Sequence, residues 1–172
     1  MSELTLHIGD RIHYGGHGVC LVCGRETKDL GASRRDYFLL RPMGNDRITL
    51  YLPVDAQPER VHLRRMLSAQ EIYSLVNREQ DNPPHWISDS RTRRQVCGQT
   101  LRSGDPVALI RLVKNLYLHA QQMPAGRLMP MSDQELLSSA ERQLYDEFQF
   151  VLNIGQDQLL PFLLGQCQVT AK

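Results

Sequence analysis

The sequence lacks the features that would place it in or across a membrane. No run of about 18 apolar residues occurs among its 172 residues, which excludes a membrane-spanning helix. The first residues, Met1–Thr5, lack the basic start and apolar stretch of a signal peptide. We therefore expect a cytoplasmic protein with no membrane partner.

The common sequence motifs of catalysis are missing as well. There is no Gly-rich phosphate loop of the Walker type and no Gly-x-Ser-x-Gly elbow, and the six histidines form no His-Glu-x-x-His pattern. His17 stands between Gly16 and Gly18, a setting typical of a hydrogen-bonded turn. We expect no enzymatic activity, no cofactor and no small-molecule substrate.

Cysteine is sparse and poorly arranged for metal binding. Of the four cysteines, Cys20 and Cys23 have Cys-x-x-Cys spacing, but Cys97 and Cys167 do not form a second pair. The first pair falls within a predicted strand, where residues three apart point to opposite faces. We expect these thiols to behave as small apolar residues and predict no metal site.

Charge is present in near balance but is unevenly distributed. The net charge of the whole chain is +1, yet residues 78–128 hold eight Lys/Arg against four Asp/Glu, a net charge of +4. Residues 129–172 hold two against six, a net charge of −4. The middle segment is therefore the candidate for contact with an anionic partner such as nucleic acid.

Short β-prone runs dominate the first third of the chain. Runs of strand length and composition occur at Val19–Val22, Asp36–Leu40 and Ile48–Leu52, and turn residues separate them at Leu30–Ser33 and Gly44–Asp46. Strands this close must pair antiparallel, because no segment between them can form a parallel crossover. Val61–Met66 reads as a last strand. We predict a small, strongly bent β-barrel.

Helical signals follow the strands. Ser68 and Glu71 match a capping box, and a helix of about ten residues is expected behind it. The polar, proline-ended segment Arg78–Pro84 interrupts the pattern. We therefore divide the chain into domains 1–77 and 78–172, giving an α+β protein.

The second domain has the periodicity of a compact all-α bundle of about four helices. Gly104, Asp105 and Pro106 suit the end of one helix and the start of the next. A second capping box is expected at Ser132–Glu135, at the start of a long amphipathic helix.

The basic run Ser90–Arg102 has two different helical faces. Helical phasing places Arg91 and Arg94 together, whereas Arg93 falls on the opposite side with apolar neighbours. The single tryptophan, Trp86, lies just before this run. The sequence leaves open whether its indole is packed in the protein or available to a partner.

These residues together resemble the CarD/CdnL family of bacterial transcription regulators that bind RNA polymerase. The first half is also similar to the polymerase-interacting domain of the transcription-repair coupling factor. In the first half the resemblance rests on Ile8–Asp10, Tyr14, His17–Val19, Tyr37–Leu40, Leu52–Val54 and Leu63–Arg64. In the helical half it rests on Trp86, Ser103–Asp105, Leu116, Ser132 and Glu135.

The resemblance implies a Tudor-like barrel that adds its edge strand to the polymerase β subunit. The implied docking edge is Arg47–Leu52, with Thr49 and Tyr51 facing outward and Lys28 as a helper. A helical domain would contact promoter DNA at the upstream edge of the melted bubble and stabilise the open complex. The implied DNA contacts are Trp86, Arg91, Arg93 and Arg94.

The family tryptophan stands about one helical turn closer to the Ser-Gly-Asp stop than Trp86 does, at the position of Ser90. Either the first helix of this domain is one turn longer here, or Trp86 is not the residue that wedges into DNA. The alternative function is a protein–protein adaptor on RNA polymerase without direct DNA contact.

Overall fold

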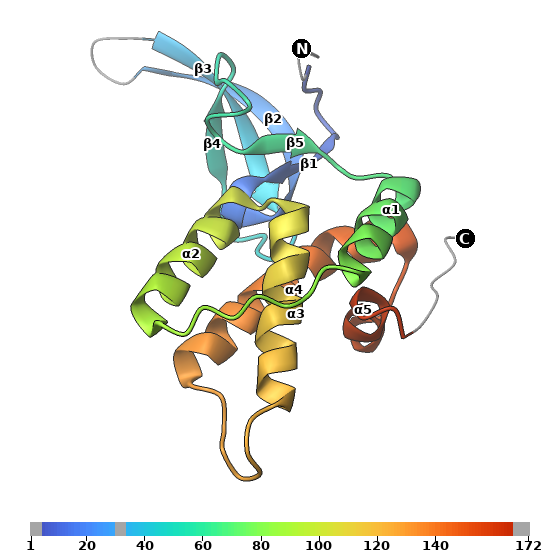
Figure 1. Ribbon diagram of the computed structural model, residues 1–172. Helices are drawn as coiled ribbons and strands as arrows, with labels where there is room; N and C mark the ends of the chain where they lie inside the picture. The colour runs from blue at the N-terminus through green and yellow to red at the C-terminus, as the bar shows by residue number, and fades with distance from the viewer. Residues whose placement is uncertain (1–4, 30–33, 167–172) are drawn as a thin grey trace. The chain divides into compact units, whose positions relative to one another are not determined.

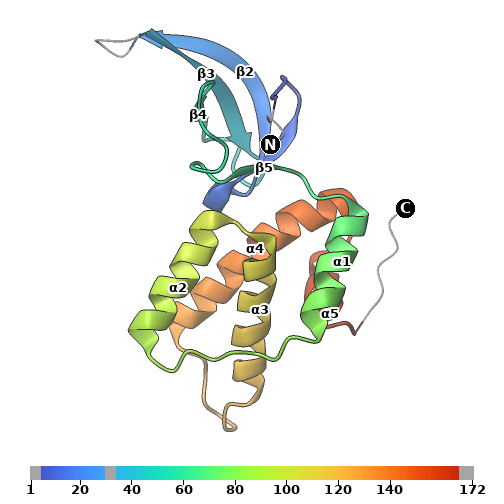
Figure 2. The same cartoon turned by 45° about the horizontal axis from the view of Figure 1, so that its top comes forward.

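The computed structural model describes residues 5–29 and 34–166, so the predicted turn Leu30–Ser33 and Cys167 lie outside the described residues (Figures 1 and 2). Contacts divide the chain into two units, Met1–Met66 and Leu67–Lys172. The sequence analysis placed this division between Asn77 and Arg78. The difference arises because Ile72 and Val76, on the intervening helix, pack into the core of the helical unit.

The first unit is an antiparallel sheet with strand order β4-β3-β2-β1-β5. Its strands are β1 (Arg11–Tyr14), β2 (Val19–Asp29), β3 (Arg34–Pro42), β4 (Leu50–Pro53) and β5 (Leu63–Arg65). All four predicted runs form strands, which confirms the antiparallel arrangement. Ile48 and Thr49 precede β4 instead of belonging to it.

The sheet has two margins, and the expected closure into a barrel is not confirmed. β4 and β5 lie at opposite ends of the strand order and do not pair with each other within residues 5–29 and 34–166. A closed barrel needs a ladder of hydrogen bonds between its first and last strands. Here those strands are only 4 and 3 residues long.

A β-bulge and a small apolar core shape the sheet. The β2–β3 register shifts between Val22 and Gly24, so Cys23 is the extra residue, which bends the longest strand. One face buries an apolar cluster formed by Ile12, Cys20, Val22, Leu40, Leu52 and Leu63. Burial raises the pKa of the Cys20 thiol to about 12, which keeps it protonated.

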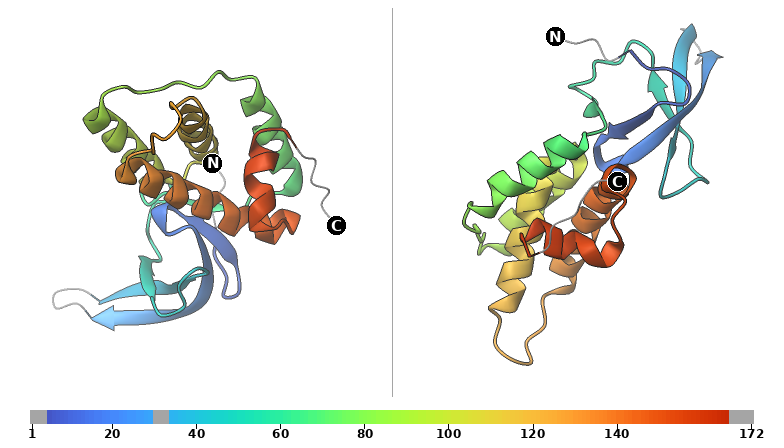
Figure 3. Two further views of the ribbon diagram at one scale, coloured as in Figure 1. Left: turned by 90° about the horizontal axis from the view of Figure 1, so that it is seen from below. Right: turned by 90° about the vertical axis from the view of Figure 1, so that its right-hand side faces the viewer.

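The second unit consists of five helices within the described residues. They are α1 (Ala69–Gln80), α2 (Ser90–Ser103), α3 (Pro106–Gln121), α4 (Met131–Leu152) and α5 (Gln156–Leu163). α3 packs against α1, α2 and α4, and α5 lies beside α1 and α4 (Figure 3). The four helices expected after residue 78 are confirmed as α2 to α5. None of the described helices has the length and apolar character needed to cross a bilayer.

Helix ends follow the predicted signals at two of three places. Ser68 and Glu71 form the expected capping box, with Ser68 N donating to Glu71 Oε2 at 2.8 Å. Gly104 adopts φ 63°, and Asp105 accepts a bond from Ala108 N at 2.8 Å.

The capping box predicted at Ser132–Glu135 is wrong. α4 begins at Met131, two residues earlier than a cap at Ser132 would place it, so Ser132 lies inside the helix. The carbonyl oxygen of Pro130 accepts from the N–H groups of Asp133 and Gln134 at 2.9 and 3.0 Å. The proline backbone thus sets the helix start, and no side-chain cap is formed there.

Candidate functional site

The outer margin of β4 is the first candidate site. Val54 N donates to Asp36 O at 3.0 Å, so the polar backbone groups of Val54 face β3. Because these groups alternate in direction along a strand, those of Leu52 and Leu50 also face β3, and those of Tyr51 point outward. No described strand pairs with this outward side. Pro53 exposes a carbonyl there but has no N–H.

Aromatic and cationic side chains gather next to this margin. The Lys28 Nζ lies 3.5 Å from the centroid of the Tyr51 ring, a cation–π contact. Tyr37 meets Tyr51 edge to face, with 6.2 Å between ring centroids and an interplanar angle of 87°. Tyr51 is still 42% exposed. The structure thus brings Lys28 and Tyr51 together and adds Tyr37, which the sequence analysis did not single out.

Arg47 and Thr49 lie in the exposed segment that leads into β4. The backbone N–H of Arg47 donates to Asn45 Oδ1 at 3.2 Å, so this arginine belongs to a turn and not to a strand. Thr49 is exposed immediately before β4. All four expected docking residues therefore lie on or beside one sheet margin, with Arg47 farthest from the paired strands.

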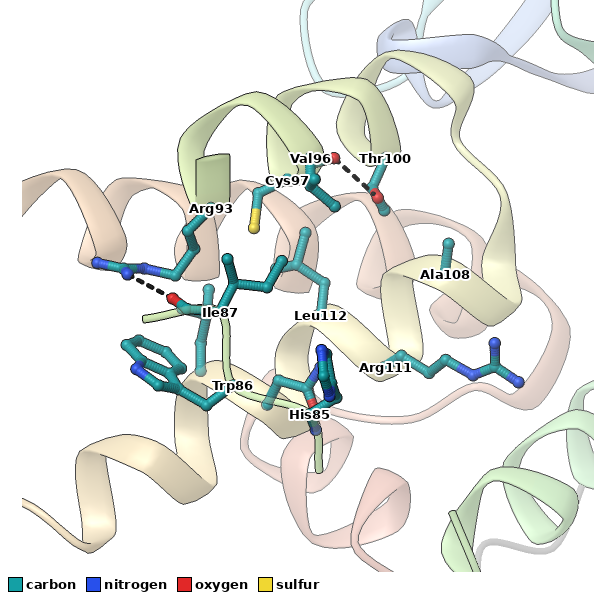
Figure 4. A pocket seen from close by; sticks show the side chains of 12 residues that line it. His85, Trp86, Ile87, Arg93, Val96, Cys97, Thr100, Ala108, Arg111 and Leu112 are labelled. Carbon is teal, nitrogen blue, oxygen red and sulfur yellow. Dashed lines mark hydrogen bonds between the residues drawn. The ribbon is translucent and has the colours of Figure 1, made fainter. Parts of the chain in front are cut away.

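The second candidate site surrounds Trp86 in the helical unit (Figure 4). The indole stacks on His119 of α3, with 3.4 Å between ring centroids and an interplanar angle of 7°. The Arg93 guanidinium carbon lies over the indole at 4.4 Å from its centroid. Because the imidazole already fills one face, the guanidinium occupies the other. Trp86 is half-buried, with both ring faces covered.

Arg93 is buried and fully engaged by the protein. It donates to Asp133 Oδ1 at 3.2 Å and Oδ2 at 2.8 Å, and to the carbonyl of Ile87 at 2.7 Å. The side chain of Arg93 is 8% exposed and that of Asp133 4%. Arg93 therefore does not present the free guanidinium expected of a DNA contact. Its position on the apolar side of the predicted helix was the sequence signal for this burial.

Arg91 and Arg94 are exposed on α2, as the helical phasing predicts. Arg94 lines a shallow depression with Ser132 and Glu135 of α4. Asp89 is the N-cap of α2, and its carboxylate accepts from Thr92 N at 2.7 Å. This hydrogen bonding, from both the side chain and the backbone of Thr92, lowers the pKa of Asp89 and keeps the cap charged.

An apolar cavity of about 280 Å³ lies between α2, α3 and the segment that carries Trp86 (Figure 4). Ile87, Cys97 and Leu112 contribute to its wall. His85 N donates to Asn115 Oδ1 at 2.9 Å and holds the segment to α3. Trp86 itself lines this cavity, so its ring borders open space as well as His119 and Arg93.

A charged cluster fixes the start of the same segment. Arg111 of α3 donates to the buried Glu79 carboxylate at 2.6 and 3.0 Å, and Asn82 donates to it at 2.9 Å. Lys114 donates to the carbonyls of Glu79 and Gln80 at the end of α1. The hydrogen bonds from Arg111 lower the pKa of Glu79 despite its burial. The sequence analysis missed this cluster because its partners are distant along the chain.

Residues 6–67 match the family described as the CarD-like/TRCF RID domain. The match covers the sheet unit and stops where the helical unit begins. No match to the chain is found among curated proteins.

Proposed function

We propose that the chain is a transcription regulator that docks on the polymerase β subunit, because residues 6–67 match the family described as the CarD-like/TRCF RID domain. Once docked, it stabilises the open promoter complex through DNA contacts at the upstream edge of the bubble that do not read sequence. The unpaired outer margin of β4 is the observation that carries this proposal.

The docking step is β-strand addition to this margin. Tyr51 offers both an N–H and a carbonyl to an incoming strand, whereas Pro53 can only accept. The N–H of the partner-facing ladder is therefore supplied by Tyr51. An aromatic and cationic surface lies beside the outer margin of β4 and selects the side chains of the partner strand. It is formed by Tyr37, Tyr51 and Lys28.

The DNA contact is made by the helical unit. Arg91 and Arg94 are exposed and attract phosphates without reading bases. Trp86 joins them by leaving both His119 and Arg93 and exchanging these partners for base pairs at the edge of the bubble. Arg93 stays with Asp133 and takes no part in this contact.

Such a regulator works by differential affinity. It binds the opened promoter better than the closed one and shifts the population between them. CarD-like RNA polymerase-interacting domains are in general not enzymes, and the proposal requires no catalysis, no cofactor and no small-molecule substrate. The site of action is the bacterial cytoplasm, with the polymerase at the nucleoid.

The experiment is binding of the chain to a polymerase β-subunit fragment, measured by calorimetry or pull-down. Tyr51→Pro removes the outward backbone N–H at the margin and should weaken binding by about tenfold, the loss of roughly one hydrogen bond. Tyr51→Phe keeps that N–H and the aromatic ring and is the matched control. Equal affinity of both variants and the wild type would exclude docking at β4.

An adaptor without DNA contact is the second candidate. It is favoured by one observation, the coverage of both faces of Trp86 by His119 and Arg93. The double variant Arg91→Glu/Arg94→Glu separates the two functions. Loss of open-complex stabilisation with normal polymerase binding supports the DNA contact, and no loss supports the adaptor.

A further inference from the structure

The segment between α3 and α4, residues 122–130, displays an apolar side chain to solvent. Leu128 is 83% exposed, the largest exposed fraction of any large apolar side chain among the described residues. Met131, at the start of α4, is 71% exposed. The segment projects beyond the ends of both helices (Figures 1 and 3). Leu128 therefore has no packing role within the helical unit.

The segment is held in a defined conformation. Arg127 N donates to Pro124 O at 3.0 Å, and Gly126 has φ +83°, as the third position of a type II turn requires. Met129 packs against the helical core, and its carbonyl accepts from Gln134 Nε2 at 2.6 Å. Leu128 is thus fixed between a hydrogen-bonded turn and an anchored residue.

Both ends of this segment attach to the Trp86 site. His119, in the last turn of α3, stacks on Trp86. Asp133, in the first turn of α4, binds Arg93. The exposed Arg94 lines a depression with Ser132, next to the start of α4. Leu128 therefore belongs to the same end of the helical unit as the proposed DNA contacts.

The local charge favours an anionic partner, such as nucleic acid, over a basic or neutral surface. Residues 121–132 contain one arginine, Arg127, which is exposed, and no acidic residue. An apolar side chain with a neighbouring arginine is the combination that inserts between base steps while contacting phosphate. Leucine is among the residues that proteins use for this insertion.

We propose that Leu128 inserts into the minor groove of partly opened DNA while Arg127 contacts an adjacent phosphate. The inference rests on the proposed function, because it adds a contact to the same DNA-binding end. Trp86 must leave two partners to reach DNA, whereas Leu128 is already exposed. Leu128 therefore makes the first apolar contact with the opening strands.

The test is titration of a forked duplex with the full chain, with 2-aminopurine placed at the junction to report unstacking. Leu128→Ala should weaken binding about fivefold and abolish most of the fluorescence increase, because the apolar contact is lost. Ile8→Ala, at a residue 66% exposed in the sheet unit, is the matched control and should behave as wild type. Arg127→Gln should reduce the salt slope by about one unit.

The outcomes distinguish the insertion of Leu128 from the proposed function. Wild-type binding that is unchanged by Leu128→Ala overturns the insertion and leaves the proposed function standing. Failure of the wild type to bind the fork overturns both. Weakened binding of Leu128→Ala to polymerase, with unchanged DNA binding, assigns the segment to a protein surface and also overturns the insertion. The emission spectrum of Trp86 checks that each variant is folded.

Discussion

Arg93 and Asp133 form a buried, two-pronged ion pair that joins α2 to the first turn of α4. The nitrogen–oxygen distances are 3.2 and 2.8 Å, and both side chains are less than one-tenth exposed. The same guanidinium covers Trp86 and holds the carbonyl of Ile87. Arg93 thus connects α2, α4 and the segment before α2 that carries Trp86 and Ile87.

Asp133→Ala should destabilise the protein by about 3 kcal/mol, because a buried guanidinium loses its counter-charge. Urea unfolding followed by circular dichroism measures this change. Arg35→Ala is the matched control, since the Arg35–Asp55 pair is 3.6 Å long and exposed, and it should change stability by less than about 1 kcal/mol. Similar losses of unfolding free energy for Asp133→Ala and Arg35→Ala would contradict the claim that burial makes the Arg93–Asp133 pair important for stability.

Trp86 is the chain's one tryptophan, so its fluorescence reports a single site. His119→Ala uncovers one face of the indole and should increase quenching by acrylamide while shifting the emission to longer wavelength. The lost ring contact should lower stability by about 1 kcal/mol. His7→Ala, which changes an exposed histidine of the sheet unit, serves as the control. Unaltered quenching in His119→Ala would show that the stack does not persist in solution.

The stability contributed by Glu79 should depend on pH. Its pKa in the folded protein lies below the ordinary value of 4.5, because Arg111 and Asn82 hydrogen-bond the charged form. The contribution is therefore fully present above pH 4.5 and is lost as the pH falls through the lower folded-state pKa.

Comparison of the wild type with Glu79→Gln measures this contribution. The difference in the free energy of unfolding should be largest near neutral pH and should shrink under acidic conditions. A difference that stays constant across this range would mean that the carboxylate charge does not contribute.

Arg91 and Arg94 should each contribute to salt-dependent DNA binding. Arg91→Gln or Arg94→Gln should reduce the slope of log affinity against log salt by about one unit, as expected for one lost phosphate contact. Arg41→Gln changes an exposed arginine of β3 and should leave the slope unchanged. If Arg91→Gln and Arg94→Gln both kept the salt slope of the wild type, the DNA contact would lie elsewhere.

Local patterns predicted the parts of the fold that depend on neighbouring residues. The strand at Asp36–Leu40, the capping box at Ser68 and the helix end and restart at Gly104–Pro106 are all confirmed. Helical phasing also separated Arg93 from Arg91 and Arg94, although Arg93 was still counted among the DNA contacts. What these patterns lacked was the identity of partners far along the chain.

The misses arise from such distant or competing interactions. Asp133 is 40 residues from Arg93, so their pairing leaves no local signal. Closure of the sheet depends on whether β4 and β5 meet, which strand composition does not encode. The predicted cap at Ser132 was wrong because Pro130 is the N-cap of α4, so Ser132 lies within the first turn of the helix. The choice of docking and DNA residues is a prediction that the binding experiments address.

The shortness of β4 has a consequence for the solubility of the chain. Exposed sheet borders commonly template fibre growth, since each added copy presents a fresh border to the next. Here the border formed by β4 spans four residues and ends in a proline, which has no N–H, so it is too short to support an extended ladder between identical molecules.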